Sequence, residues 1–380
     1  MFPRTRRPLL AGLAALAVVA GLSGAASCDA LRRKSSLEEL ATTQLSTETA
    51  PWYIIHGILV GGPELTLRDS GSGAVVDAVD YLTTERQIKD RTGQLISSPY
   101  REDELPRFPR TDGQFVGQGH PNQFLATLTG VGIPLSHPVV LQGGGSFTLA
   151  DALESAKLNL RASQILVVPP EAEFEDHELG WSIGLIADTL GTDAKWTNKW
   201  GEDVSLEGLV EIAVQRPLGW GSCGGTHELS GLARALRAHR AKHEELSGVW
   251  QRVARYLDDG KARARASQHA DGSFDYEWAQ PQPREAQTEL VLNRKVHITG
   301  HMLEWLALAS SPEEIGAPYL QKAYAFLESA RFREVALEPG RRGTSIVGYG
   351  SVTHAVRGMN LYRQKLAAAH TGAVNDKTPG

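Results

Sequence analysis

The feature that most constrains this chain is a histidine followed by an apolar segment, which recurs six times. The histidines are separated by 50 to 74 residues, enough for one helical hairpin with its loops. Self-similarity at such an interval is the signature of a repeat architecture. The six are His56, His120, His177, His227, His301 and His354.

Amphipathic stretches with more charge alternate with these segments. In residues 317–331 the apolar positions Tyr319, Leu320, Ala323 and Leu327 recur at three- and four-residue spacing, which predicts a helix with one buried face. Similar stretches are residues 37–45, 75–88, 148–160, 205–214 and 244–264. Alternating buried and amphipathic helices predict an all-α fold, an (α/α)6 toroid with an inner and an outer ring. Residues 165–168 form the single run that reads as a strand.

The run Gln268-His269-Ala270-Asp271-Gly272-Ser273-Phe274 resembles the repeat of terpene cyclases and protein prenyltransferases, and Asp112-Gly113-Gln114-Phe115 is a weaker copy. This resemblance implies an α/α toroid whose lumen holds the ligand. It implies no catalytic residue, because the chain has no Asp-rich motif. Gly221-Ser222 also precede Cys223 where prenyltransferases carry the Asp-x-Cys pair of their zinc site.

The first 27 residues read as a secretory signal peptide. Three arginines, Arg4, Arg6 and Arg7, precede an apolar run, and small residues lead into Cys28. Cys28 resembles the lipidated cysteine of a bacterial lipobox, although Ala25 stands where Leu is usual; a plain signal peptide is the alternative. We therefore expect a lipid-anchored tether over residues 28–45, a toroid domain over 46–370 and a disordered tail over 371–380. The protein would be exported and held at a bacterial membrane surface, facing the periplasm or the exterior.

Charge and cysteine content exclude several classes of protein. With 39 basic and 44 acidic residues the net charge is −5, which gives no electrostatic footprint for nucleic acid. Two cysteines are too few for a disulfide scaffold or a Cys-rich metal cluster.

If the apolar segments form the inner ring, the six histidines converge as a collar at one mouth of the lumen. Helix N-termini and like-charged neighbours would keep these imidazoles neutral, as a general base or a metal ligand requires. The predicted catalytic residues are His177, His227, Glu178, Glu228 and Tyr349. The predicted ligand-binding residues are His56, His120, His301 and His354, together with the aromatic residues Phe124, Trp181 and Trp305 four positions after a collar histidine.

Other interpretations of the same residues stay open. The histidines could simply lock each hairpin, or they could form a metal site with Glu178, Glu228 or Glu304. The aromatic residues could belong to the core. Cys223 could form a nucleophile pair with His227, or it could be an incidental buried thiol.

The sequence therefore predicts a lipoprotein whose lumen binds a small molecule or a glycan. We expect a carbohydrate-active or other hydrolase or lyase, and no cofactor is predicted. The alternatives are a non-catalytic binding protein and a metal-binding protein.

Overall fold

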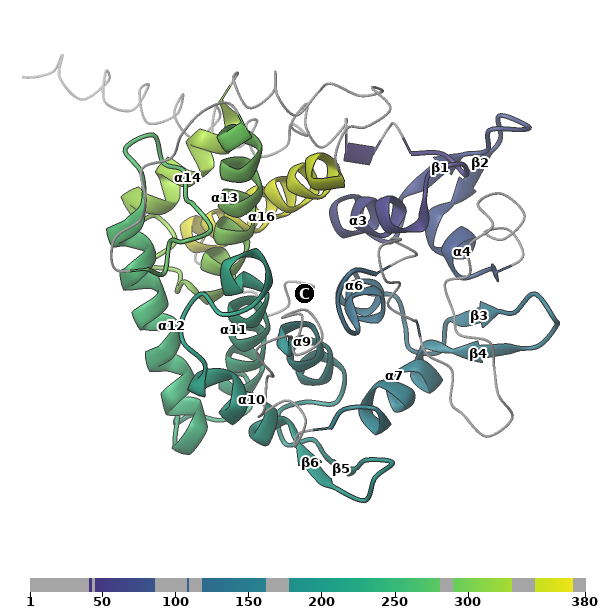
Figure 1. Ribbon diagram of the computed structural model, residues 1–380, viewed down its shortest axis with the longest axis horizontal. Coiled ribbons are helices and arrows are strands. Elements are labelled where there is room, and N and C mark those ends of the chain that lie inside the picture. Colours follow the sequence, from purple (N-terminus) through teal and green to yellow (C-terminus); the bar gives the residue numbers. More distant parts are fainter. Residues whose placement is uncertain are drawn as a thin grey trace, which may run out of the picture.

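The protein is built mainly of helices in a computed structural model (Figure 1). The structure describes residues 41–42, 45–85, 108, 118–161, 178–280, 290–329 and 346–371. Residues 165–168, His177, the predicted signal peptide with Cys28, and the Asp112–Phe115 copy of the repeat lie outside these ranges. Among the described residues, no helix has the length and apolarity needed to cross a membrane.

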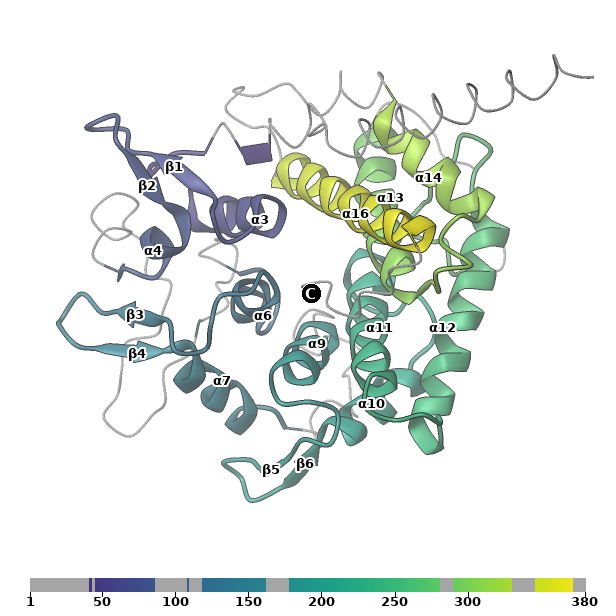
Figure 2. The ribbon, with the colours of Figure 1, turned by 180° about the vertical axis from the view of Figure 1, so that it is seen from behind.

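Six helices face the middle of the molecule (Figures 1 and 2). They are α3 (Pro51–Gly61), α6 (Gln123–Gly130), α9 (Gly180–Thr189), α11 (Thr226–Arg240), α13 (Leu290–Ala309) and α16 (Ile346–Thr371). Each contacts the next in chain order, and α16 contacts α3. The histidine-led segments of the described residues therefore lie next to one another.

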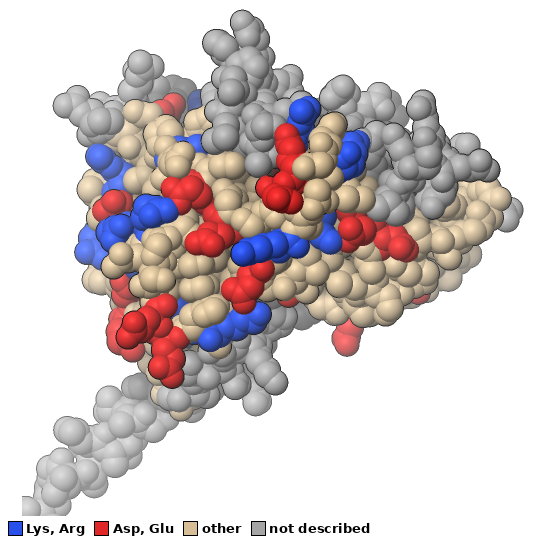
Figure 3. Space-filling model, turned by 90° about the horizontal axis from the view of Figure 1, so that it is seen from below, with Lys and Arg blue, Asp and Glu red and all other residues tan. Residues whose placement is uncertain are grey.

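Shorter or more amphipathic helices lie farther from the middle (Figure 1). They are α4 (Ala78–Leu82), α7 (Leu149–Leu158), α10 (Leu206–Gln215), α12 (Gly248–Ser267) and α14 (Pro318–Glu328). All five overlap the amphipathic stretches predicted above, although α10 and α12 end one and three residues beyond their predicted bounds. Figure 3 shows basic and acidic side chains interspersed on one side face of the molecule, without a large area of one sign.

The expectation that only residues 165–168 resemble a strand was wrong. Two-stranded antiparallel hairpins follow α3, α6 and α9: β1 (Thr66–Arg68) with β2 (Val75–Asp77), β3 (Pro138–Val140) with β4 (Ser146–Thr148), and β5 (Lys195–Thr197) with β6 (Asp203–Ser205). Each strand has three residues, too few for an alternating pattern to stand out.

In all three hairpins the second strand ends in the N-cap residue of the following helix. The last residue of the second strand, Asp77, Thr148 or Ser205, is also the helix N-cap, and its side chain accepts a hydrogen bond from a backbone N–H of the first turn. The hairpin thereby sets where each outer helix begins.

Glycines allow neighbouring inner helices to approach through their backbones. A Cβ atom on Gly231 of α11 would lie 2.2 Å from the carbonyl oxygen of Gly180 in α9, and one on Gly180 would lie 2.1 Å from that of His227. Gly300 and Gly358 bring α13 and α16 together in a similar way. This close packing holds His227 beside the segment that begins α9.

Replacing Gly231 by alanine should therefore destabilise the protein by about 1–3 kcal/mol, the usual cost of overpacking. Urea unfolding measures the change. Gly316→Ala is the matched control, because a Cβ atom there meets nothing within 4 Å. Equal effects of the two substitutions would show that the α9–α11 approach is not tight.

Candidate functional site

The five collar histidines in the described residues form one connected group. Ring centroids are 4.5 Å apart for His120 and His227, 5.0 Å for His227 and His301, and 3.8 Å for His301 and His354. His56 joins through His354 at 5.5 Å. Four of the five are buried, and His120 is partly exposed. The convergence of these histidines, predicted from the repeat, is therefore confirmed for these five.

Their position in the helices differs from the prediction. His301 and His354 lie well inside α13 and α16, and His56 is the sixth residue of α3. A helix N-terminus therefore does not act on them, because its effect fades within the first turn. Burial, together with the charge of neighbouring histidines, instead lowers the pKa of His56, His301 and His354.

Glu178 lies between two of these imidazoles and its side chain is fully buried. One oxygen is 2.9 Å from Nδ1 of His227, and the other is 2.8 Å from Nδ1 of His120. Burial opposes ionisation of Glu178, but the charges of His227 and His120 outweigh it and hold its pKa below the usual value.

Glu304 is held in a similar way on the opposite side of the group. His354 Nδ1 lies 2.9 Å from one carboxylate oxygen, and Nε of Arg357 lies 2.8 Å from the other. Burial would raise the pKa of Glu304, but His354 and Arg357 together lower it to about 2. The two His–Glu pairs span 49 and 50 residues, so the pairing repeats with the architecture.

Cys223 lies at the edge of the histidine group in an unusual backbone conformation. It belongs to η2 (Ser222–Gly225), the turn that leads into α11, and has φ +52° and ψ +38°. Glycine is the residue that adopts this region without strain, and Gly221, Gly224 and Gly225 around it also have positive φ. The turn therefore keeps a cysteine at a position where glycine would be less strained.

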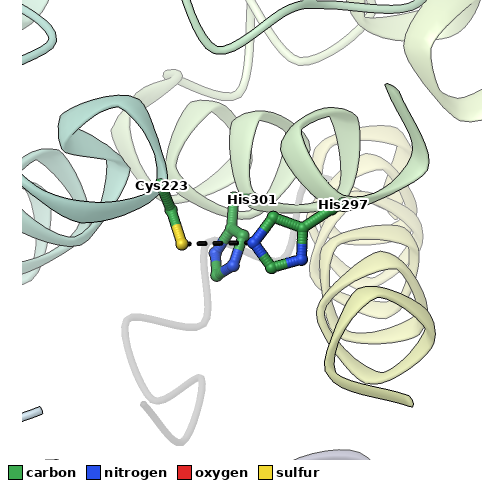
Figure 4. Close-up of side chains that lie close together, drawn as sticks. All are labelled: Cys223, His297 and His301. Carbon is green, nitrogen blue, oxygen red and sulfur yellow. Dashed lines mark hydrogen bonds between the residues drawn. The ribbon is translucent and has the colours of Figure 1, made fainter. Parts of the chain in front are cut away.

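The thiol contacts the imidazole of a histidine that the sequence analysis missed. Cys223 Sγ lies 3.2 Å from Nε2 of His297, whose Nδ1 is 3.0 Å from Oγ of Ser351 (Figure 4). His297 precedes His301 by four residues on α13, and their rings lie 4.7 Å apart. This spacing of one helical turn could have identified it from the sequence. Cys223 itself is partly exposed.

His227 differs from the other buried imidazoles in its protonation. Burial alone would lower its pKa, but the Glu178 carboxylate, and after it Cys223, raise the pKa well above the usual value. Burial and the charges of three other histidines lower the pKa of His297 to about 3. The thiol of Cys223 is 3.2 Å from Nε2 of His297, whereas Nε2 of His227 is buried and has no hydrogen-bond partner in the described residues.

Two of the predicted catalytic residues have structural partners instead. Glu228 accepts hydrogen bonds from the backbone N–H of Leu179 and from Arg216, which tie α11 to the start of α9. Burial raises the pKa of Glu228 to about 7 although Arg216 opposes the shift. Tyr349 donates its hydroxyl to the carbonyl of Ala41 at 2.5 Å.

Of the three predicted aromatic residues, only Trp181 joins the histidine group, with its ring 5.3 Å from that of His227. Phe124 packs on Phe108 in the hydrophobic core, because α6 begins only at Gln123 and the spacing from His120 is not a helical turn. Trp305 packs on Trp278. Its ring reaches α12, where a Cβ atom on Gly260 would lie 3.3 Å from it.

A small cavity of about 20 Å³ lies against the inner side of the group, lined by residues that include Trp181, His227, Glu304, His354 and Arg357. That volume has room for about one water molecule.

Three groups of side chains bring possible metal ligands within 4.8 Å of one another. They are Cys223, His297 and His301; His120, Glu178 and His227; and His301, Glu304 and His354. His301 belongs to two of them. Comparisons of the chain with protein families, with curated proteins and with solved structures gave no match.

Proposed function

We propose that the chain is a thiol-dependent enzyme of acyl transfer, with Cys223 as nucleophile, His227 as base and Glu178 as the group that orients the base. The observation that carries this proposal is the fully buried Glu178 carboxylate, 2.9 Å from Nδ1 of His227, an imidazole close enough to Cys223 for the thiol to raise its pKa. Nucleophile, base and orienting acid are the three parts of a triad.

The hydrogen bond to Glu178 determines which of the two ring nitrogens of His227 carries a proton. A carboxylate only accepts, so Nδ1 carries a proton and Nε2 is left for the thiol. Glu178 also raises the pKa of His227, which makes it the better proton acceptor. His297 has a pKa near 3 and would not hold the proton, so its role is to position the sulfur.

The backbone supports the same roles. A non-glycine residue in the left-handed region costs about 1–2 kcal/mol, and such strain gathers at functional sites. Cys223 also lies three residues before the first residue of α11, whose N-terminal N–H groups favour the negative charge that develops on an acyl oxygen.

The proposed step balances without a co-reactant other than water. The Cys223 sulfur attacks the acyl carbon, its proton passes to His227, and the bond to the leaving group breaks. His227 then protonates the leaving group. Water, deprotonated by His227, hydrolyses the thioester and restores the thiol.

The overall fold, the location of the protein and its class of substrate are also part of this proposal. The closed order of contacts among α3, α6, α9, α11, α13 and α16 supports the (α/α)6 toroid of terpene cyclases and prenyltransferases. The signal-like N-terminus supports export and anchoring through Cys28, with a small molecule as substrate. A glycosidase gains less support, because Glu178, Glu228 and Glu304 are all buried and paired with His or Arg.

Alkylation of Cys223 by iodoacetamide tests the proposal, in a chain with Cys28→Ser so that one thiol reacts. At pH 7 the rate should exceed that of free cysteine, and His227→Ala should lower it at least tenfold, since a base contributes about 10²–10⁴-fold. His297→Ala is the matched control, with a smaller effect expected. Thermal melts show that each variant folds.

Turnover of activated esters and thioesters completes this test. Cys223→Ser should abolish it, whereas Ser222→Ala should not. An alkylation rate equal to that of free cysteine, unchanged in His227→Ala, would overturn the proposal.

A metal site is the second candidate, favoured by the three ligand groups. Nitrogen, sulfur and carboxylate donors suit Zn²⁺. If it exists, the exported chain loaded with Zn²⁺ at pH 8 and then desalted should retain about one ion per chain by mass spectrometry. His301→Ala should lose it, because His301 belongs to two groups, while His137→Ala, outside all three, should not. Absence of retained zinc removes this candidate.

A further inference from the structure

A larger cavity, of about 510 Å³, lies at the other end of α11. It is bounded by the C-terminal parts of α11, α13 and α16 and by α12. Its residues Arg237 and Arg240 follow His227 by 10 and 13 positions, which places them about 15–20 Å along the helix from the histidine group. The volume falls within the range of about 300–1,000 Å³ of small-ligand sites.

The wall of this cavity is mostly aliphatic. Leu236, Ala254, Leu257, Leu308 and Leu361 are among the residues that line it. Among the described residues no aromatic side chain lines it, so it offers a surface for a flexible hydrocarbon chain rather than a stacking surface for a ring.

The polar residues of the cavity give it a positive balance. Four basic side chains, Arg237, Arg240, Lys261 and Lys365, face two acidic ones, Asp258 and Glu314. Both acids bind Lys261, at 2.8 and 2.9 Å, and four basic against two acidic side chains leave a net charge of +2 on the lining. A lining with net positive charge favours an anionic occupant.

Lys365 is positioned to meet such an occupant. Its ammonium donates to the carbonyls of Ala307 and Leu308 at 3.0 and 3.1 Å, where α13 ends. An ammonium has three N–H donors, and within the described residues the third has no acceptor. Burial, followed by the positive charge of Arg237, lowers the pKa of Lys365 to about 8, as expected where positive charge is not neutralised.

We propose that this cavity is a second binding site, for an aliphatic chain that ends in an anionic head such as a carboxylate or a phosphate. The hydrocarbon would lie against α12 and α16, and the head would meet the basic side chains at the end of α11. The site is separate from the thiol and does not depend on its chemistry.

Calorimetry of the exported chain with five probes tests this. Dodecanoate and dodecyl phosphate should bind, and whichever binds more tightly identifies the head group. Dodecyltrimethylammonium, with the same chain and the opposite charge, should bind at least tenfold more weakly, and acetate should not bind. Octanoate should also bind at least tenfold more weakly than dodecanoate, since each buried methylene contributes about fourfold.

Two substitutions locate the binding. Ala254→Trp fills the cavity from α12 and should weaken dodecanoate binding at least tenfold, whereas Ala262→Trp, exposed on the same helix, should not. Arg240→Glu, at an exposed position that leaves the core intact, should weaken both anionic probes. Equal affinity for the cationic probe, or full affinity in both Ala254→Trp and Arg240→Glu, would overturn the proposal, as would no binding of either anion.

Discussion

Lowering the pH from 7 to 5 should unfold the protein, because the histidine group is buried in its neutral form. His56, His297, His301 and His354 all have a pKa below the usual value. In the unfolded chain these four histidines become protonated near pH 6.5, whereas in the folded protein they stay neutral at that pH because their pKa is lower. Their contribution to stability is therefore complete above pH 6.5 and is lost as the pH falls below it.

The expected size of this effect is large. Four protons taken up on unfolding give a slope of about 5 kcal/mol per pH unit, against a total stability of about 5–15 kcal/mol for a typical domain. His227 does not add to this loss, because its pKa is raised and it is charged in both states at pH 5. Its own contribution instead disappears as the pH rises through its folded pKa.

Urea unfolding at half-unit steps from pH 5 to pH 8 measures the slope. His297→Gln should reduce it by about one quarter, since one titrating group is removed. His370→Gln, exposed near the end of α16, should leave it unchanged. A free energy of unfolding that stays constant from pH 7 to pH 5 would show that the imidazoles can be protonated in the folded protein.

Much of the helix arrangement and of the histidine convergence could be predicted from the sequence, because repeated segments occupy equivalent positions in a repeat fold. The period placed five histidines together and located the helices that alternate with them. It could not say where each helix begins: α13 starts eleven residues before His301, so the argument from the helix N-terminus failed. The four-residue spacing from His301 predicted that Trp305 would contact the ligand. Such a spacing places two residues near the same face of a helix, but it does not say which neighbouring helix each of them contacts, and Trp305 packs on Trp278.

The pairing of side chains was less predictable than their convergence. Glu178 and Glu228 follow their histidines in the same way in the sequence, yet Glu178 bridges two imidazoles while Glu228 binds Arg216 and the backbone of Leu179. The difference comes from partners about 50 residues away, which only the packing of α9 on α11 brings near. The glycine-rich run around Cys223 indicates a turn, but no local pattern places the thiol against His297 of α13.

Glu304→Gln should destabilise the protein by about 3–5 kcal/mol, the usual cost of breaking a buried ion pair by removing one partner. The substitution keeps the shape of the side chain but leaves the buried Arg357 without its counter-charge. A folded pKa of about 2 gives a consistent figure, since ionisation near pH 2 rather than 4.5 is worth about 3 kcal/mol. This stability is present above pH 4.5 and is lost as the pH falls towards 2.

Glu211→Gln is the matched control for this substitution. Glu211 also pairs with an arginine, Arg252, but both side chains are more than one third exposed: Glu211 is 34% exposed and Arg252 is 46% exposed. Water screens such a pair, so its loss should cost less than about 1 kcal/mol. Urea unfolding at pH 7.5, where His56, His297, His301 and His354 are neutral, compares the two variants. If both cost the same, the Glu304–Arg357 pair is not buried as described, and the cavity that both residues line must be open to water.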